Sequence, residues 1–336
     1  MKLASIEKIE EISPIEGADK IEVAKILGWR IVIPKNTYKV DDLVVFVPID
    51  TIIEPRDWNS FLVDKNNPSN PIRIRTCEFR GQVSQGICFP MSILPEGSYE
   101  IGEEVSHLAG VSKYERPIPV HLAGLVAGNF PIHIISKTDE DNLLSNPSIY
   151  DKLLLCDFVE LSLKMDGVSS TFIKHNSEIK VCSRNIELKR GDSIFWRMAG
   201  KYNLEEIIPD NTSIQFETCG PSILGNKMGL STNEIYIFNY KDLVSNEYLD
   251  KSTVGGNGIS LPWVNQVEFF TQGTLPTIDE LQEIANKQVY ENGNPAEGIV
   301  FRGYNFDSST LRMKLAYSKE LQKMLSVKII NQNYKD

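Results

Sequence analysis

An apolar stretch of the chain is followed directly by a lysine, and an aspartate and a glycine come soon after that lysine. The residues are Lys164, Asp166 and Gly167, and the preceding stretch, Phe158–Leu163, is predicted to form a strand. A lysine can attack phosphorus only when its amine is uncharged, and its ordinary pKa is about 10.4. Burial and nearby positive charge both lower that pKa. Three fixed residues match by chance in roughly one chain in ten of this length. The pattern alone therefore does not establish that Lys164 attacks phosphorus.

An ordered series of further motifs follows this lysine. Each motif taken alone has an ordinary structural explanation that involves no chemistry. Glu217 and Glu297 can be surface acids, Phe238 can be a core residue and Lys314 can be a solvated base. One lysine, two carboxylates and several cations are nevertheless the groups that phosphoryl transfer requires, since cations offset the charge that develops on the phosphoryl oxygens. In chain order the motifs are Ser183-Arg184-Asn185, Gln215-Phe216-Glu217, Ile235-Tyr236-Ile237-Phe238, Glu297-Gly298-Ile299-Val300 and Arg312-Met313-Lys314.

Taken together, the series resembles the covalent nucleotidyltransferase superfamily, which includes the ATP-dependent polynucleotide ligases and the mRNA capping enzymes. The match spans Lys137 to about Lys319. The resemblance implies that Lys164 attacks ATP to form a lysyl-AMP and that AMP then moves to a 5′-phosphate end. A 3′-hydroxyl end then attacks that activated phosphate and releases AMP. It also implies Mg²⁺ or Mn²⁺ as the metal.

The resemblance further implies a role for each residue of the series. Phe238 would stack on the adenine, Arg184 would grip phosphate or ribose, and Lys314 with Arg312 would clamp the α-phosphate. The implied catalytic residues are Lys164, Glu217, Glu297, Arg312 and Lys314. The implied ATP-binding residues are Leu163, Lys164, Asp166, Gly167, Arg184, Glu217, Phe238, Glu297 and Lys314. Asp166, Glu217 and Glu297 would hold the metal mainly through water, because Mg²⁺ keeps several waters.

Two positions depart from the pattern of these enzymes. Asn142 stands where an Arg commonly follows the Thr138-Asp139-Glu140 element, and Arg312 stands where a Lys is frequent. Arginine keeps the charge of lysine but differs from it in geometry.

The first 120 residues have a different character. Short predicted strands separated by turn residues indicate a small barrel. They include the alternating segment Ile21–Leu27, the segment Arg30–Pro34 and the buried-strand run Leu43–Pro48. Together with Ser13–Ile21, this strand series resembles the OB-type barrels of tRNA-binding accessory domains. We expect the barrel to bind nucleic acid through basic and aromatic side chains. The candidates are Lys35, Tyr38, Lys39, Arg73, Arg75 and Arg80, joined by Arg184 from the second domain.

The predicted fold class is α+β. An N-terminal OB-type β-barrel over residues 1–120 is followed, over residues 121–336, by a nucleotidyltransferase (ATP-grasp-like ligase) domain of antiparallel sheets and helices. A boundary is expected between Lys113 and Phe130, where Pro117, Pro119, Gly124 and Gly128 interrupt the pattern. In the second domain, helices are predicted over Ser193–Lys201, Thr277–Tyr290 and Ser318–Leu325.

The order of the two domains separates branches of the superfamily. Capping enzymes and ATP-dependent DNA ligases continue from the Lys314-type motif into a C-terminal OB domain, whereas the 22 residues after Lys314 are too few for a five-stranded barrel. The OB-like domain in front, the segment Phe130–Glu140 and the loop Ser222–Lys227 resemble the RNA ligases with an N-terminal OB domain, which seal nicks that carry a 3′-hydroxyl RNA end. An ATP-dependent DNA ligase and a non-catalytic OB-fold RNA-binding protein remain as alternatives.

Composition narrows the class of protein. The 336 residues carry a formal charge of −10 and are 41% hydrophobic, which excludes dominant disorder, and no apolar run approaches the length of a membrane span. The acidic balance argues weakly against a nucleic-acid partner, but bases gather locally between Lys174 and Lys201, and local potential governs polyphosphate binding. Five widely spaced cysteines without a CxxC pair favour neither a disulfide framework nor structural zinc. We therefore expect a cytoplasmic monomer without a signal peptide, whose partner is RNA or an RNA-containing nicked duplex.

Overall fold

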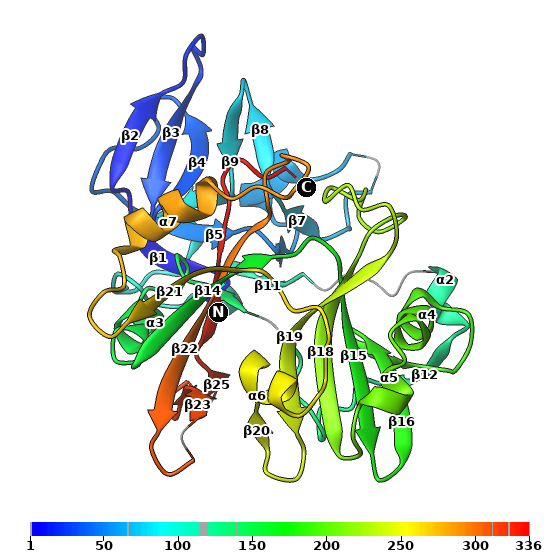
Figure 1. Cartoon of the computed structure of the whole chain (residues 1–336). Helices are drawn as coiled ribbons and strands as arrows, with labels where there is room; N and C mark the ends of the chain where they lie inside the picture. Colours follow the sequence, from blue (N-terminus) through cyan, green and yellow to red (C-terminus); the bar gives the residue numbers. More distant parts are fainter. Residues whose placement is uncertain are drawn as a thin grey trace. The chain divides into compact units, whose positions relative to one another are not determined.

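The computed structural model describes residues 2–65, 67–114, 120–138, 140–310, 312–321 and 323–335 (Figure 1). By its internal contacts the chain divides into two compact units. The first comprises residues 1–116, 144–147 and 335–336, and the second comprises residues 117–143 and 148–334. Of the residues expected to mark the boundary, Pro117 and Pro119 lie outside the described residues.

Short strands dominate the first unit. They form three antiparallel ladders in the orders β1-β5-β10, β2-β3-β4 and β11-β6-β7, together with a β8-β9 hairpin. The elements are β1 Ser5–Lys8, β2 Glu11–Pro14, β3 Ile21–Ile26, β4 Trp29–Pro34, β5 Leu43–Pro48, β6 Thr51–Ile53, η1 Asp57–Leu62, β7 Ile72–Ile74, β8 Cys77–Phe79, β9 Gln82–Ser84, β10 Gly86–Pro90, η2 Met91–Ile93, α1 Ser106–Ala109 and β11 Val111–Lys113.

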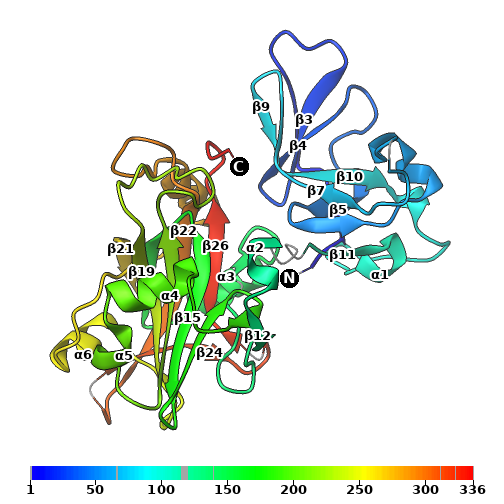
Figure 2. The same cartoon turned by 90° about the vertical axis from the view of Figure 1, so that its right-hand side faces the viewer.

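A hydrophobic core joins the first and third ladders of the first unit. It includes Ile6 of β1, Val45 and Val47 of β5, Ile53 of β6 and Phe89 of β10. β4 contacts both β9 and β10, so the second ladder lies next to the first (Figure 2). Burying each large aliphatic side chain contributes about 1.5–3 kcal/mol, which explains why the apolar run of β5 lies at the centre of its ladder. The unit has the expected OB-type character of short antiparallel strand pairs that pack against one another.

The second unit contains two sheets and most of the helices. Its elements are α2 Val120–Ala123, β12 Val126–Asn129, β13 Asp141–Asn142, α3 Ser148–Leu153, β14 Phe158–Lys164, β15 Val168–His175, β16 Glu178–Ser183, β17 Ile186–Leu188, α4 Ile194–Lys201, α5 Leu204–Ile207, β18 Thr212–Cys219, β19 Glu234–Asp242, β20 Glu247–Tyr248, α6 Lys251–Gly256, β21 Gln266–Thr271, α7 Ile278–Asn286, β22 Gly298–Asp307, β23 Arg312–Leu315, β24 Tyr317–Ser318, β25 Lys323–Met324 and β26 Ser326–Ile330.

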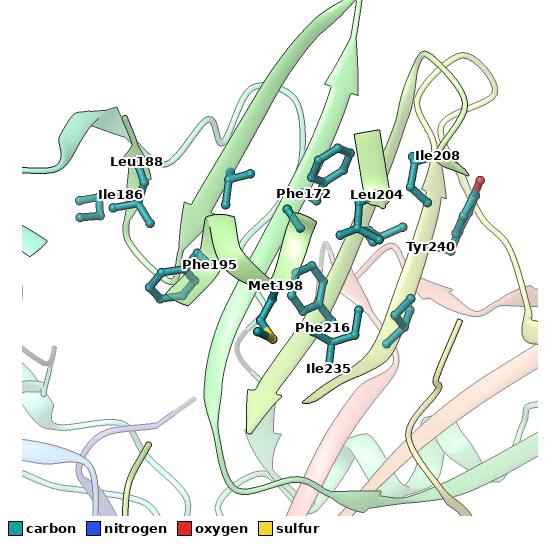
Figure 3. Packing of buried hydrophobic residues seen from close by; sticks show 14 of the residues in the cluster. Phe172, Ile186, Leu188, Phe195, Met198, Leu204, Ile208, Phe216, Ile235 and Tyr240 are labelled. Atoms are coloured by element: carbon teal, nitrogen blue, oxygen red, sulfur yellow. The ribbon is translucent and has the colours of Figure 1, made fainter. Parts of the chain in front are cut away.

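Each sheet of the second unit is covered by helices on one face. The seven-stranded sheet has the order β12-β17-β16-β15-β18-β19-β20, and Phe172, Phe216 and Ile235 pack there against Phe195 and Met198 of α4 (Figure 3). The six-stranded sheet has the order β13-β26-β22-β14-β21, with β23 paired to β22. The core beneath it joins alternate residues of β14, β22 and β26 to α3 and α7. The opposite faces of both sheets carry the polar residues discussed below.

The helix predictions meet with mixed success. The prediction over Ser193–Lys201 is confirmed as α4, which Ser193 caps. The prediction over Thr277–Tyr290 is confirmed in part as α7, which Thr277 caps in a capping box with Glu280 and which ends earlier than predicted, at Asn286. The prediction over Ser318–Leu325 is wrong. The described residues there form the two short strands β24 and β25, because pairing within the fold overrides local helix propensity.

Candidate functional site

Lys164 is the last residue of β14. It lies opposite Gly298, the first residue of β22, and its Nζ is 2.9 Å from Oε2 of Glu297. Both side chains are largely buried, with 22% and 23% of their surface exposed. The preceding residue, Leu163, packs in a small apolar cluster, and its N–H donates to the Asn265 carbonyl at 2.8 Å. The strand β14 therefore holds the ammonium group of Lys164 against the carboxylate of Glu297.

The Asp166-Gly167 turn carries the chain from one sheet to the other. Gly167 is required there because a Cβ would lie 2.4 Å from the Thr218 carbonyl oxygen and 2.9 Å from Cγ of Glu217. This close approach brings Asp166, which is 4% exposed, and Glu217 of β18 to the same place as Lys164 and Glu297. Four of the predicted site residues are therefore gathered between the two sheets.

The charges in this cluster influence one another strongly. Burial raises the pKa of Glu217 to about 8, with Lys164 opposing and Glu297 adding to the rise. Burial also raises the pKa of Asp166 above its ordinary value. Burial acts to lower the pKa of Lys164, but the charges of Glu297 and Glu217 and the hydrogen bond to Glu297 outweigh it, so that pKa is raised. The nearest charged partners of this amine are therefore carboxylates, whereas positive neighbours would be needed to lower its pKa.

The donor set suits a divalent cation held through water. Within the described part of the chain, Oδ2 of Asp166 is buried without a hydrogen-bond partner. The negative charge of Glu297 also acts on Asp166 and raises its pKa. No group of three acidic, histidine or cysteine side chains among the described residues is placed to ligate one ion directly. Mg²⁺ and Mn²⁺ prefer oxygen donors, and Mg²⁺ keeps several of its waters. Asp166, Glu217 and Glu297 therefore fit a hydrated cation better than a dehydrated one.

Phe238 occupies an irregular position in β19. Gln215 pairs with Asn239 and Phe216 with Ile237, so Phe238 is the extra residue of a β-bulge. A bulge re-aims the side chain that it carries and is common beside active sites. Arg302 of β22 donates a hydrogen bond to the Phe238 carbonyl, and its guanidinium lies 5.7 Å from the centre of the ring. Phe238 is therefore half-buried between the sheets, on the same side as Lys164.

Arg184 follows β16 at the end of the seven-stranded sheet. It is exposed, and its charge acts to lower the pKa of Glu217. The neighbouring Asn185 accepts a hydrogen bond from Nζ of Lys137 at 2.9 Å. Of the Thr138-Asp139-Glu140 element beyond Lys137, Asp139 lies outside the described residues. Asn142 lies in β13 and is buried.

Arg312 and Lys314 lie far from this cluster. In the register of β22 and β23 they oppose Asp307 and Asn305, seven or more residues along β22 from Gly298. At about 3.3 Å per residue and 4.8 Å per strand, the Cα atoms of Lys164 and Lys314 are about 25 Å apart. Lys314 instead pairs with Glu247 at 2.6 Å and Asp307 at 2.8 Å, and Arg312 is exposed. The prediction that these two residues clamp the α-phosphate is therefore not supported by the sheet register.

Lys328 is the basic residue that the motif search missed. It lies on β26 opposite Val300, which in turn opposes Ser162. Its neighbours Val327 and Ile329 are fully buried in the core beneath the sheet, so Lys328 projects from the opposite face, which Lys164 also occupies. By the same spacings, the Cα atoms of Lys164 and Lys328 are about 12 Å apart. The apolar-polar alternation of Ser326–Ile330 was a signal for this strand that could have been read from the sequence.

The predicted RNA contacts of the first unit fall into two groups. Lys35, Lys39, Arg75 and Arg80 are exposed, and Arg80 with Gly81 forms the tip of the β8-β9 hairpin. Arg73, by contrast, lies 3.9 Å from the centre of the Tyr114 ring and 3.9 Å from a carboxylate oxygen of Asp50. Tyr38 is half-buried, and burial raises its pKa to about 12. The exposed bases are therefore better placed for a polyanion than Arg73.

Comparisons with known proteins bear on both units. Residues 3–91 match an OB-fold domain family, and residues 157–315 match the family described as RNA ligase. The chain therefore carries an OB-fold domain followed by an RNA ligase domain, the domain order of RNA ligases with an N-terminal OB-fold domain. None of the curated proteins matches the sequence significantly.

Solved structures resemble the ligase along nearly its whole length. The Naegleria gruberi RNA ligase with PPi is 29% identical, with a TM-score of 0.75, and the match covers 98% of this chain and 97% of that one. A lysine-to-methionine variant of that enzyme with AMP and Mn is also 29% identical, covers the same shares and has a TM-score of 0.77. A lysine-to-alanine variant with ATP and Mn gives 29% identity, the same coverage and a TM-score of 0.76.

The raised pKa of Glu217 predicts a dependence of stability on pH. The folded protein keeps a proton on this carboxyl up to about pH 8, whereas the unfolded chain releases it near pH 4.5. The free energy of unfolding should therefore fall as the pH rises from about 5 to 8, and Glu217→Gln should remove this loss, on the order of 1–3 kcal/mol. The raised pKa of Lys164 acts only above its ordinary 10.5, outside this window. Urea unfolding at pH 5, 6.5 and 8 measures the effect.

The matched control is Glu268→Gln, which removes an exposed carboxylate from β21. It should leave the difference between pH 5 and pH 8 as in the unmodified protein. Equal pH dependence of the unmodified protein and Glu217→Gln would contradict the assignment of the proton to Glu217.

Proposed function

We propose that this RNA ligase joins a 3′-hydroxyl RNA end to a 5′-phosphate end with ATP, through lysyl-AMP and an adenylylated RNA end, at nicks in duplexes. The observation that carries the proposal is the close approach of Lys164 Nζ to Glu297 at 2.9 Å. Asp166 from the adjoining turn and Glu217 from the other sheet lie at the same place. The solved structures of the Naegleria enzyme with PPi, with AMP and Mn, and with ATP and Mn support the choice of substrate.

The reaction begins when the Lys164 amine attacks the α-phosphorus of ATP. A P–N bond forms, the bond to the β-phosphate oxygen breaks, and pyrophosphate leaves. The AMP then passes to the 5′-phosphate of the RNA, which frees the lysine and forms a new P–O–P bond. A 3′-hydroxyl finally attacks the RNA phosphate, joins the strands and releases AMP. Each step is a displacement on phosphorus, so positioning and charge stabilisation supply most of the catalysis.

Lys164 must lose its proton before it can attack. Burial favours the neutral amine, whereas Glu297 and Glu217 favour the charged one. A divalent cation, held through water by Asp166, Glu217 and Glu297, would supply the positive charge that offsets these carboxylates. Glu217 is already protonated for much of its population at pH 7, which weakens its opposition to the neutral lysine.

The surrounding residues suit the parts of the nucleotide. Phe238, turned by its bulge, would stack on the adenine, and Glu217 would also bind a ribose hydroxyl. Arg184 would grip phosphate or the terminal ribose. Lys328, which shares the sheet face of Lys164, takes the phosphate-clamping part first expected of Lys314 and Arg312.

We propose that the OB-fold unit binds the RNA. Its exposed Lys35, Lys39, Arg75 and Arg80 offer a sequence-independent attraction to phosphates. Arg73 would contribute only after giving up its contacts with Tyr114 and Asp50, and Tyr38 only after greater exposure of its half-buried side chain. Lys164, Asp166, Glu217 and Glu297 all belong to one unit of one chain, which suits a monomer.

The proposed setting is RNA repair in the cytoplasm. All five cysteines are free, which suits a reducing compartment. No helix of the described chain is long and apolar enough to cross a membrane.

The first prediction of this proposal concerns covalent labelling. Incubation with ATP labelled at the α-phosphate and Mg²⁺ or Mn²⁺ should leave a label on the protein that alkali does not remove and that acid hydrolyses, because a phosphoramidate forms at Lys164. Lys164→Ala should abolish it, whereas Lys174→Ala, a change at a lysine that binds carbonyl oxygens at the other end of the sheet, should retain it. A Lys164→Ala protein that still traps label would contradict the assignment, and an unlabelled unmodified protein would favour a non-catalytic RNA-binding role.

A second prediction distinguishes two lysines. Lys328→Ala should slow lysine adenylation by about 100-fold, the scale expected when a charge that stabilises the transition state is lost. Lys314→Ala should slow it by less than about threefold, because Lys314 pairs with Glu247 and Asp307 instead of facing Lys164. The single-turnover rate of lysyl-AMP formation measures both. The reverse order of effects would restore the original assignment of the phosphate clamp to Lys314.

A third prediction separates RNA from DNA sealing. On nicked duplexes that differ only in the sugars flanking the break, ends with a ribose at the 3′-hydroxyl should be sealed faster than ends with deoxyribose. Pre-adenylylated strands should show the same preference, since the attacking hydroxyl acts after adenylate transfer. Equal rates on the two sugars would favour the DNA ligase alternative.

A further inference from the structure

The hydrogen-bonded ladder between β14 and β22 stops where the site begins. The paired residues run from Phe158 opposite Tyr304 to Lys164 opposite Gly298, and no pair is formed beyond them. Gly298 has a φ of +152°, and a Cβ there would lie 2.1 Å from the Ile329 carbonyl oxygen. Glu297, immediately before it, is therefore outside the ladder, although its side chain must meet Lys164.

A single tyrosine hydroxyl spans this end of the ladder. The Tyr290 hydroxyl donates to the Lys164 carbonyl oxygen at 2.9 Å and accepts from the Glu297 N–H at 3.1 Å. A phenol has one proton to donate, and here both its donor and an acceptor position are used. The backbone of the proposed nucleophile is thus tied to the backbone of its carboxylate partner through one oxygen atom.

The tyrosine itself is held firmly. Its ring is 3% exposed and packs in the cluster with Leu163, Met165 and Cys219. Its N–H donates to the Asn294 carbonyl at 2.8 Å, within the turn that leads from α7 to Glu297. Burial raises the pKa of the phenol, so the hydroxyl keeps its proton and remains a donor.

We propose that Tyr290 is a positioning residue for adenylation, an inference that rests on the proposed function of Lys164. The hydroxyl fixes Lys164 relative to Glu297 and so keeps Nζ on its line of attack. Glu297 has a second support, because the Asn331 N–H donates to its carbonyl at 3.0 Å. Lys164 keeps its pairing with Gly298, so loss of the hydroxyl removes the direct link between the backbones of Lys164 and Glu297 and leaves each with its own strand neighbour.

The test is Tyr290→Phe, which keeps the ring and removes only the hydroxyl. Single-turnover formation of lysyl-AMP at saturating ATP should slow by about 10- to 100-fold, the cost of a displacement of about 1 Å at a reacting group. The dissociation constant of ATP should change by less than about twofold. Sealing of a nick that already carries the 5′-adenylate should slow by less than about threefold, since Lys164 is not the nucleophile in that step.

Tyr304→Phe is the matched control. Tyr304 lies on the same strand pair, opposite Phe158, and its hydroxyl donates to Glu160 at 3.0 Å, at the end of the sheet away from Lys164. This variant should lose comparable thermal stability but keep the adenylation rate of the unmodified protein.

Three outcomes would overturn the inference. Tyr290→Phe could adenylate at the rate of the unmodified protein, or it could lose adenylation, sealing and ATP binding in equal measure, which would indicate general disruption of the fold. Absence of label on the unmodified protein would instead overturn the proposed function, and the inference with it.

Discussion

One buried ammonium group and three carboxylates share the space between the two sheets of the ligase unit. A lysine moved out of water is costly unless a partner compensates its charge. Glu297 provides that compensation through a direct contact of 2.9 Å, and Glu217 adds to it from the other sheet in the fraction of molecules in which it is ionised. The three acids in turn repel one another, and Glu217 yields by holding its proton to about pH 8. The free protein therefore rests in a state that is electrostatically satisfied and chemically inactive, with its lysine protonated.

Such a cluster requires strict control of strand register. Side chains alternate along a strand, so a slip of one residue in β14 or β22 would turn Lys164 or its neighbours into the core beneath the sheet. The buried residues Val159, Leu161, Ile299 and Phe301 prevent that slip, because it would place them on the polar face. The crossing at Gly167 makes the second sheet part of the same arrangement by bringing the backbone to within contact distance of Glu217. Hydrophobic packing thus fixes the positions of charges that repel or attract one another.

Local patterns in the sequence were enough to find most of the site. The alternation of β14, the turn after Lys164 and the ordered carboxylates predicted residues that do converge. Two of the predicted helices, those beginning at Ser193 and Thr277, are also present, with these residues as their caps. The distinction between Lys314 and Lys328 could not be made in this way. Both lysines lie in short strands with apolar neighbours, and only the pairing with β22 shows that one lies near Lys164 and the other near Asp307. The charge state of Lys164 was also out of reach, because it depends on a distance between residues 133 positions apart.

The end of the β14-β22 ladder reconciles two opposing demands. The nucleophile and its carboxylate must be rigid relative to each other, which continued strand pairing would ensure. Continued pairing, however, would fill the space between the sheet ends with backbone and leave a nucleotide no access to Nζ. Gly298 ends the pairing with β14 by adopting a conformation and a close approach that side chains do not tolerate, and Glu297 leaves that ladder while it keeps its hydrogen bond to Asn331 beyond β26. The Tyr290 hydroxyl then restores one connection between the two backbones from the buried side. On the side of the core, the Tyr290 hydroxyl thus keeps the backbones of Lys164 and Glu297 rigid relative to each other. On the side from which a nucleotide must approach Nζ, the pairing of β14 with β22 does not continue, because a side chain has replaced a peptide group in the hydrogen-bond pattern.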